Sequence, residues 1–502
     1  MTCAKGTVWC PAALAAVLAL AGCMGGDDRA GSARAGGSIT IGVSAVPETL
    51  DPALAHELPE LQVLWVVHTP LVTYRREAGG EGTQVVPGLA RALPTVSDDG
   101  LSYRLRLRPG LHYSNGAPVR PGDFERAIER LRALDSPLAP LYEGIASIDA
   151  DADTGAIRVT LAQPDPAFPQ LLALPASAPL PRGTPSRDLS RRPPPGVGPY
   201  RLVRSGTRTE LLRTRDFELP GVPAGHVDRI TLVRPSPPAR QVQAVITGSL
   251  DVMQEPTPVN LLPEIPAKYR DRYREDPTAA TVSLVPDTES SPLDAASVRR
   301  AIGQSLDAET LTRLYQGLLE PSCNVLPQAI PGYRPVDPCP YGNRDEPPDL
   351  PAAEQAIETT AADGARISVT ADAGVPPVVV RQVIRTLRTI GLAASARRGG
   401  ARIRLKRFAP ILGHPAAFLE PIARRVLDDE LAATVAEGTL APAGEEADDA
   451  WAEADRRVVE RGYVAPIGTE LRPALVSERL DIENCFRFQP LFGLDLSSLC
   501  LM

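Results

Sequence analysis

The chain has 502 residues, of which 23% are charged, and its formal net charge at pH 7 is −8. This length suits two to four domains and allows a large buried core. Because the charge balance is acidic and offers no basic surface, we expect no nucleic-acid partner.

The first 22 residues predict a signal peptide. Lys5 supplies the basic start, and the apolar stretch from Val8 to Leu20 is too short for a comfortable membrane span. The next residues, Leu20-Ala21-Gly22-Cys23, resemble the lipobox of bacterial lipoproteins. This resemblance implies that Cys23 carries the lipid and that residues 23–36, which are small and polar, form a flexible tether. The alternative is an ordinary signal peptide with a chance cysteine.

Alternating apolar residues predict the first strand over Ser38–Ser44, and helical spacing predicts a helix over 58–68. The clearest local pattern follows at residues 97–119, which read SDDGLSYRLRLRPGLHYSNGAPV. Apolar and basic residues alternate from Leu101 to Arg108 and predict a half-buried strand. We expect a short return strand at His112-Tyr113, and then a helix with Pro121 in its first position.

A second hairpin is predicted from Ile145–Asp149 and Ile157–Leu161. Residues 175–195 are rich in Pro, Arg and Ser and predict a linker. A strand over Val227–Val233 and a helix over Arg240–Ile246 follow.

Two helices are predicted within Ser291–Gly317, the second capped by Asp307. Farther on, a strand over Arg366–Thr370, a helix over Val378–Ile390 and a strand over Arg402–Phe408 predict a parallel β-α-β unit. The inward face of this helix is predicted to hold Val380, Val383, Ile384 and Leu387. Residues 430–455 are acidic and rich in alanine, and we expect them to be helical at most.

Four cysteines follow Cys23, namely Cys323, Cys339, Cys485 and Cys500. An even number outside the cell favours disulfides, for which three sets of pairings are possible. We favour Cys323–Cys339 and Cys485–Cys500 because each closes a short loop, and four separate thiols are the alternative. The spacing does not suit a zinc or redox site.

The stretch from Val86 to Leu134 as a whole resembles the extracytoplasmic solute-binding proteins of peptide-type ABC importers, family 5, which includes peptide and nickel binders. Shorter matches occur at Leu50-Asp51-Pro52, Pro70–Tyr74 and Gly196–Leu202. The closing residues, from Leu480 onward, are similar to an actinobacterial branch of the family.

The resemblance implies an α/β, two-lobed periplasmic-binding-protein-like fold of type II, with mixed sheets and an extra β-rich subdomain. We expect lobe I to be discontinuous, from residues 37–66, 194–288 and 470–502. The β-rich subdomain would comprise residues 67–193. Lobe II would comprise residues 289–469 and be shorter than is usual in the family.

In peptide binders of this family, an Asp in a segment of the pattern WxxDYxDPxxF receives the peptide's amino group. The corresponding stretch is Phe408–Phe418, where Ile411 occupies the place of that Asp and His414 that of a second acid. Apolar Ile411 cannot pair with an ammonium group. The expected ligand-cleft residues are Asp51, Tyr200, Phe408, Ile411 and His414, with core packing as the alternative for Phe408 and a structural role for His414.

The motifs of common enzymes, such as GxSxG and HExxH, are absent from the sequence, and its five histidines are scattered. We therefore predict no catalytic residues, no metal site and no cofactor, and conclude that the chain is not an enzyme.

The resemblance implies a monomeric receptor, lipid-anchored on the outer face of the cell membrane, that captures a solute such as a peptide between two lobes. It would deliver this solute to an ABC permease in the cytoplasmic membrane. The alternative is a lipoprotein that keeps the fold but acts as a sensor or surface-interaction protein without transport, as the missing Asp and the shortened lobe would favour.

Overall fold

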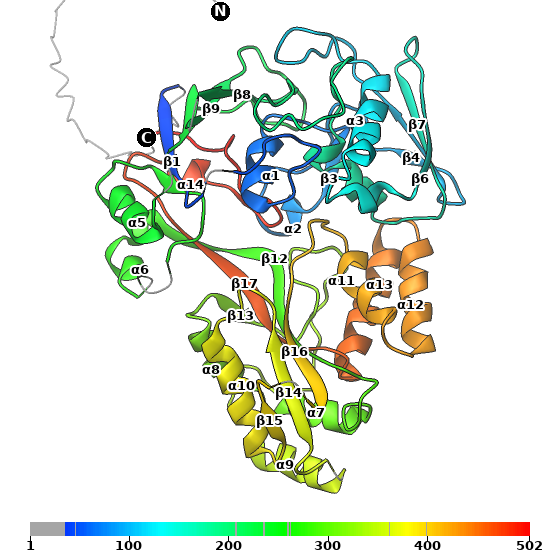
Figure 1. The fold of residues 1–502 in the computed structure, drawn as a ribbon, viewed down its shortest axis with the longest axis vertical. Helices are drawn as coiled ribbons and strands as arrows, with labels where there is room; N and C mark the ends of the chain where they lie inside the picture. The colour runs from blue at the N-terminus through cyan, green and yellow to red at the C-terminus, as the bar shows by residue number, and fades with distance from the viewer. Residues whose placement is uncertain are drawn as a thin grey trace, which may run out of the picture. The chain divides into compact units, whose positions relative to one another are not determined.

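A computed structural model describes residues 36–45, 47–205, 208–233, 236–258, 261, 263–360, 362–397 and 399–502 (Figure 1). The predicted signal peptide, the lipidation site Cys23 and nearly all of the predicted tether lie outside the described residues. Within the described ranges, no helix has the length and apolar character needed to span a membrane.

A five-stranded mixed sheet is built from segments far apart in the sequence, in the order β11-β1-β10-β9-β8. Strand β1 runs parallel to β10 and β11, while β8, β9 and β10 are antiparallel neighbours. Apolar residues of β1 and of helix α1 share one buried cluster. The elements are β1 (Ser38–Gly42), α1 (Leu58–Trp65), β8 (Tyr200–Ser205), β9 (Arg208–Arg213), β10 (Arg229–Leu232), α5 (Pro238–Ile246) and β11 (Val252–Met253).

The chain between β1 and β8 holds a four-stranded antiparallel sheet, β4-β5-β7-β6, and a β2–β3 pair. Helix α3 begins one residue after Pro121, which is the N-cap rather than the first helical residue. The elements are β2 (Val72–Tyr74), α2 (Gly79–Gly82), β3 (Val85–Pro87), β4 (Thr95–Val96), β5 (Ser102–Arg106), α3 (Gly122–Ala133), β6 (Ile145–Ala150), β7 (Ala156–Leu161) and α4 (Phe168–Leu172).

The alternation predicted around β5 is confirmed, since Tyr103 and Leu105 are buried while Arg104 and Arg106 are exposed. The predicted return strand at His112-Tyr113 is wrong. His112 forms only an isolated bridge with Pro118, because the chain turns back at once through a tight loop. The amide of Tyr113 donates to the carbonyl of Ala117 across that loop.

The predicted linker at 175–195 is wrong in its first part. Residues 175–180 are buried, and a short 3-10 helix covers Pro175–Ser177. The amide of Leu180 donates to the carbonyl of Asp123 at the start of α3. Proline-rich composition therefore marks a rigid, packed connection here.

A second, six-stranded sheet follows the order β13-β17-β12-β16-β14-β15. The predicted β-α-β unit is confirmed, because β14 pairs with β16 in parallel. The elements are β12 (Tyr273–Pro286), α7 (Ala296–Gln304), α8 (Ala308–Leu314), β13 (Leu319–Pro321), α9 (Leu350–Thr359), β14 (Arg366–Ala371), α10 (Pro377–Thr389), β15 (Ala393–Ser395), β16 (Ala401–Phe408), α11 (Ala416–Ala423), α12 (Asp429–Leu440), α13 (Glu445–Glu460) and β17 (Ala465–Leu475).

The helices around this sheet refine the predictions. Asp307 caps α8, as expected, by accepting from the amide of Thr310. In α10 three of the four residues predicted to face inward, Val383, Ile384 and Leu387, are buried. Val380 is only partly buried, and Val379 takes its place in the core. The acidic stretch 430–455 lies in two helices, α12 and α13, which are separated by the non-helical residues 441–444. Leu431, Trp451 and Ala454 supply buried positions between the charged residues.

Strands β12 and β17 run side by side and extend from the six-stranded sheet toward the five-stranded sheet (Figure 1). The first residue after β17, Val476, bridges to Val252 of β11, and the Ser477 hydroxyl donates to Asp251. The other end of each strand lies in the six-stranded sheet. These two strands are thus shared between the two sheet regions.

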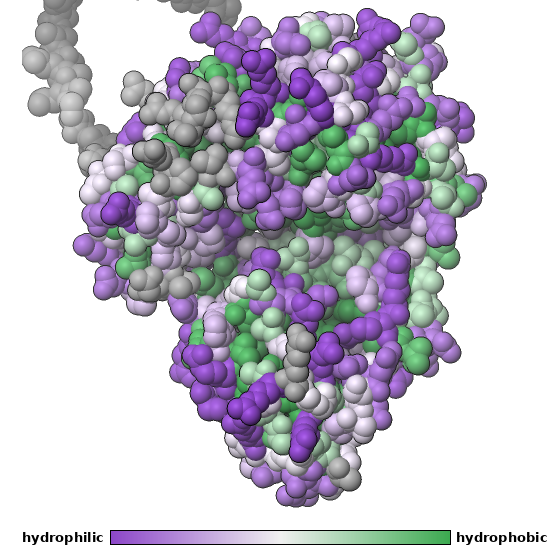
Figure 2. All heavy atoms as spheres, in the orientation of Figure 1, coloured by the Kyte–Doolittle hydropathy of each residue, from purple (hydrophilic) through white to green (hydrophobic). Residues whose placement is uncertain are grey.

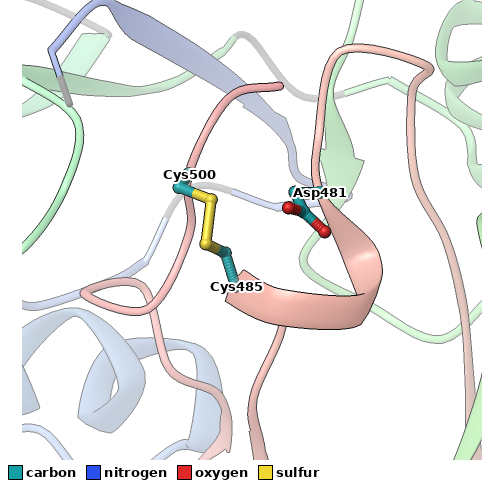
Figure 3. A group of neighbouring side chains, drawn as sticks. All are labelled: Asp481, Cys485 and Cys500. Atoms are coloured by element: carbon teal, nitrogen blue, oxygen red, sulfur yellow. A yellow bond between two sulfur atoms is a disulfide. The ribbon is translucent and has the colours of Figure 1, made fainter. Parts of the chain in front are cut away.

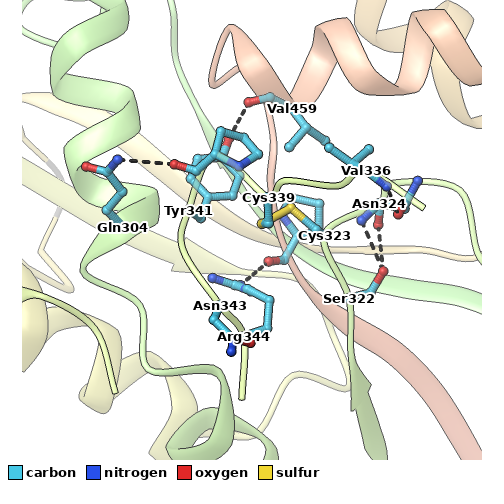
Figure 4. The surroundings of a disulfide bond; sticks show 12 residues. Gln304, Ser322, Cys323, Asn324, Val336, Cys339, Tyr341, Asn343, Arg344 and Val459 are labelled. Carbon is cyan, nitrogen blue, oxygen red and sulfur yellow. Dashed lines mark hydrogen bonds between the residues drawn. A yellow bond between two sulfur atoms is a disulfide. The ribbon is translucent and has the colours of Figure 1, made fainter. Parts of the chain in front are cut away.

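The chain ends in a short helix and a small strand pair, α14 (Ile482–Cys485), β18 (Phe488–Gln489) and β19 (Gly493–Leu494). Both favoured disulfides, Cys323–Cys339 and Cys485–Cys500, are present. Figure 4 shows Cys323–Cys339 beside Asn324, whose side-chain oxygen accepts from the amide of Val336. Nearby, the Tyr341 hydroxyl donates to the carbonyl of Val459, which ties the disulfide loop to α13.

Replacing Cys323 and Cys339 by serine should lower the free energy of unfolding by about 3 kcal/mol, because the bond closes a short loop in the unfolded chain. Urea denaturation under oxidising conditions measures the loss. The matched control replaces Cys485 and Cys500, whose separation of 15 residues is close to the 16 of the first pair and should give a similar loss. Unchanged stability in both double variants would contradict this expectation.

Candidate functional site

A small pocket lies where β12, β16 and β17 meet helix α1 and the C-terminal segment. Its cavity volume is about 120 Å³. Its apolar lining includes Leu58, Leu61, Pro410, Ile411, Phe488 and Leu491, and its polar lining includes His56, Thr278, Arg407 and Arg472. On the face drawn in Figure 2, apolar residues gather in a hollow between more polar surfaces.

The pocket exists because the β12–β17 ladder is interrupted. Pairing runs as far as Pro277 opposite Leu471 and resumes at Thr281 opposite Thr469. Pro277 has no amide hydrogen to donate, so a regular ladder cannot continue through it. The freed amide of Ala279 donates instead to the carbonyl of Pro490 at 3.1 Å. Thr278, Ala279 and Ala280 of β12 form one wall of the pocket.

The positive charge of Arg407 in β16 is compensated by the carboxylate of Glu470. Its Nε lies 2.8 Å from both carboxylate oxygens of Glu470, and its Nη2 lies 2.7 Å from Oε2. Burial alone would lower the pKa of Arg407, but the bonds to Glu470 outweigh it and raise the pKa. The pair joins β16 to β17 across β12, at the edge of the pocket.

Arg472 of β17 is in a different electrostatic situation. Its Nη2 donates to the carbonyl of Gln254 at 2.7 Å. Among the described residues, no carboxylate lies within the 4.0 Å of a salt bridge to this guanidinium. Burial lowers its pKa to about 10, and the more distant Glu255 compensates only in part. It stays protonated at neutral pH, and it lies 5.8 Å from the ring centre of Phe488, but no described carboxylate is its close partner.

Of the five ligand-cleft residues expected from the sequence, only Ile411 lines this pocket. Phe408 is buried at the end of β16, with Nζ of Lys406 at 4.3 Å from the ring centre. His414 turns toward Trp451, with ring centres 5.7 Å apart, and its Nδ1 accepts from the amide of Ala416. Burial lowers the pKa of His414 to about 4, so the ring is neutral at pH 7.

Asp51 is completely buried and pairs with Arg130 of α3. Its two oxygens lie 2.5 and 2.6 Å from Nη1 and Nη2 of Arg130, and they also accept from the amides of Ala53 and Leu189. These four bonds fill the acceptor capacity of the carboxylate. Tyr200 is buried as well, and its hydroxyl donates to the carbonyl of Val227 at 2.9 Å. Neither residue enters the ligand-contact set that we propose below.

Arg407, Arg472, His56 and Thr278 line the pocket but did not stand out in the sequence. The arginines lie on strands and alternate with apolar residues, as surface residues also do. The one available signal was Pro277 within the long strand β12, since proline in a central strand marks an interruption.

Two larger pockets flank other parts of the chain. One, of about 420 Å³, is lined by Asp165, Leu412 and Glu420 among others. The other, of about 650 Å³, is lined by Arg75, Arg487 and the buried pair of Arg76 and Asp495, whose atoms lie 2.9 Å apart. Both contain carboxylates, whereas the pocket around Arg472 and a larger one beside Arg191 and Arg192 have none among their described lining residues.

Among the described residues, one group has potential metal ligands within 4.8 Å of one another, namely Asp481, Cys485 and Cys500. Figure 3 shows that the two sulfur atoms are bonded to each other, so neither is available as a thiolate ligand. Asp481 caps α14 by accepting from the amide of Asn484. This group is structural.

Comparison with known proteins agrees with the resemblance seen in the sequence. Residues 84–384 match the family of bacterial extracellular solute-binding proteins, family 5 Middle. The chain is 26% identical over 256 residues to the glutathione-binding protein GsiB of Salmonella typhi. The aligned region covers 49% of this chain and 49% of that protein. The match thus spans about half the length of the curated relatives.

Solved structures show the same fold along nearly the whole chain. The clavulanic acid biosynthesis oligopeptide binding protein 2 superimposes with a TM-score of 0.82 and 21% identity, covering 94% of this chain and 96% of that one. The Haemophilus influenzae OppA complex with the peptide RPPGFSPFR gives a TM-score of 0.68 and 18% identity, covering 94% and 100%. The predicted two-lobed periplasmic-binding-protein fold is confirmed.

The contribution of the buried Asp51–Arg130 pair to the stability of the protein can be tested by mutation. Arg130→Met should lower the free energy of unfolding by about 3–5 kcal/mol, because it leaves a buried carboxylate without its cation. The control, Arg313→Met, removes an exposed partner of Glu309 and should cost less than about 0.5 kcal/mol. Urea denaturation of both variants measures the difference, and equal losses would contradict a stabilising role for the buried pair.

Proposed function

Because the chain belongs to the bacterial extracellular solute-binding proteins of family 5, we propose that it is a receptor that captures a small solute and delivers it to an ABC import permease. The family match over residues 84–384 carries this proposal. The family and the fold are those of binding receptors rather than enzymes, in agreement with the prediction from the sequence.

We place the solute in the pocket beside the interrupted β12–β17 ladder. In this proposal, lobe I comprises residues 37–66, 194–288 and 470–502, and lobe II comprises residues 289–469. Strands β12 and β17 then connect the two lobes and act as the hinge, since a few residues at element ends can absorb a domain rotation. The break after Pro277 supports this role, because it removes ladder hydrogen bonds where bending is needed.

The proposed solute is a peptide or a similar small molecule. Two observations support it: a curated relative is named as a glutathione-binding protein, and one structural neighbour is a complex with a peptide. Apolar residues surrounding a few polar groups are typical of small-molecule sites. The small volume of the pocket favours a short ligand or one side chain of a longer ligand.

The receptor is proposed to be a monomer held on the outer face of the cytoplasmic membrane by a lipid on Cys23. The lipobox Leu20–Cys23 supports the anchor. A diacylated cysteine with a flexible tether would keep the receptor near its permease without a membrane-spanning segment.

A second candidate function is a sensor or surface-interaction lipoprotein that retains the fold without transport. It is favoured by Ile411, because an apolar side chain lines the pocket where peptide binders of the family carry an amine-pairing carboxylate. The two functions differ in whether the protein binds and hands over a solute.

Calorimetry with a panel of di- to pentapeptides that includes glutathione tests solute capture. We expect at least one member to bind, and Ile411→Trp to weaken this binding at least tenfold because the larger ring fills the pocket. The control, Leu93→Trp, changes a residue that is 48% exposed and outside the pocket, and should leave affinity unchanged.

Uptake of the same ligand by cells with and without the protein then separates the two functions. Loss of uptake on deletion supports transport. Binding without any change in uptake favours the sensor, and absence of binding by every panel member contradicts peptide capture. Binding that Ile411→Trp does not weaken contradicts the proposed location.

A further inference from the structure

We infer that the solute carries an acidic group and that Arg472 is the residue that binds this group. The inference rests on the proposed function, because it assumes that the pocket beside β12 and β17 holds a solute. It adds a chemical class for the ligand and a residue that selects it.

In the part of the chain that the structure describes, the pocket is lined by basic side chains and by no acidic ones. Arg407, Arg472 and His56 contribute the ionisable side chains, and none of the described residues that line it is an Asp or Glu. A buried charge is costly unless it is paired and hydrogen-bonded. A solute with an anionic group would supply the partner that Arg472 lacks, whereas a cationic group placed beside Arg472 would be repelled.

The two arginines differ in whether a carboxylate of the protein already compensates their charge. Glu470 accepts from Nε and Nη2 of Arg407 at 2.7–2.8 Å, so the charge of this side chain is already compensated. Arg472 makes a single described hydrogen bond, from Nη2 to a neutral carbonyl. A guanidinium has five N–H donors. Arg472 is therefore the side chain with both charge and donors available for a ligand.

Arg472 is also held in place before any ligand binds. The residue that accepts its hydrogen bond, Gln254, is fixed by two donations from its Nε2, to Oε1 of Gln62 at 2.8 Å and to the carbonyl of Pro59 at 3.0 Å. Gln62 in turn donates to the carbonyl of Leu494 at 2.9 Å. This buried chain of amides links β17 to α1 and to the C-terminal segment. A positioned guanidinium loses little conformational entropy when it binds a carboxylate.

The other residues that line the pocket indicate which kind of chemical group lies next to the acidic group of the ligand. Leu61, Ile411, Phe488 and Leu491 line the pocket with apolar surface. The favoured ligand class is thus a small organic acid whose acidic group neighbours an apolar portion. A peptide can offer this combination through its terminal carboxylate or through an acidic side chain.

A double-mutant cycle between protein and ligand tests the inference. The ligand is the tightest-binding member of the peptide panel, compared with analogues in which the terminal or a side-chain carboxylate is converted to an amide. The protein is compared with Arg472→Met and Arg472→Lys, and Arg313→Met is the control on the exposed face of α8. Calorimetry gives the affinities, and thermal unfolding checks that every variant is folded.

We expect one amide analogue to bind at least tenfold more weakly than the acid, and Arg472→Met to reduce acid binding by a similar factor. Arg472→Met should leave the affinity of that amide unchanged, because the contact is already lost. Arg472→Lys should restore part of the affinity for the acid. The amide that loses affinity identifies which carboxylate Arg472 contacts.

Equal binding of the acid and every amide, or acid binding unaffected by Arg472→Met, would overturn the inference while leaving solute capture intact. If Arg472→Met also weakens the amides by the same factor, the residue shapes the pocket rather than binding the acid, and the inference is again overturned. Failure of the folded wild-type protein to bind any probe would contradict solute capture, and the inference would fall with it.

Discussion

The interrupted ladder between β12 and β17 is the constraint on which the proposed site depends. The two strands pair on both sides of the break, so each sheet region keeps its own hydrogen bonds. Between Pro277 and Thr281 the backbone of β12 is released and bonds to the C-terminal segment through Ala279. A continuous ladder would leave no pocket wall at this place. One proline thus interrupts the ladder at the place where the pocket lies.

The buried and partly buried arginines fall into two groups, those with a carboxylate partner and those without one. Asp51 with Arg130, and Asp495 with Arg76, are buried pairs in which each cation has its own carboxylate. Such pairs can stabilise one arrangement of the chain, because removing one partner leaves an uncompensated charge. Arg472 and Arg344 belong to a second group, because only a neutral carbonyl accepts from each of them among the described residues, and Arg472 is the one that lines the pocket. A binding site is where such an incomplete environment is expected.

Local patterns in the sequence predicted much of the fold. The alternation around Tyr103, the cap at Asp307 and the β-α-β unit ending at β16 are all present, because each depends on residues close together in the chain. The strand order of the two large sheets was not predicted, because it depends on pairings over nearly two hundred residues, such as β1 with β10. The family resemblance implied only a two-lobed fold with mixed sheets. Residues 175–180 were predicted to be a linker from their proline-rich composition, but they are buried.

The candidate site was harder to predict for the same physical reason. Ile411 was placed by its position within a family segment, whereas Arg472 acquires its character from Gln254, which lies more than two hundred residues earlier in the chain. Asp51 shows the converse case. It was expected in the cleft, but Arg130 and two amides fill its acceptor sites. A residue's role at a long-range contact cannot be read from its neighbours in sequence.

The most direct test of the proposed site is a crystal structure of the protein purified from its native host with its solute bound. We expect a solute in the pocket beside Pro277 and Ile411, with an acidic group at a hydrogen-bond distance of about 3 Å from Arg472. A solute bound instead beside Arg76 and Asp495, or bound at Ile411 through a cationic group without contact to Arg472, would contradict it.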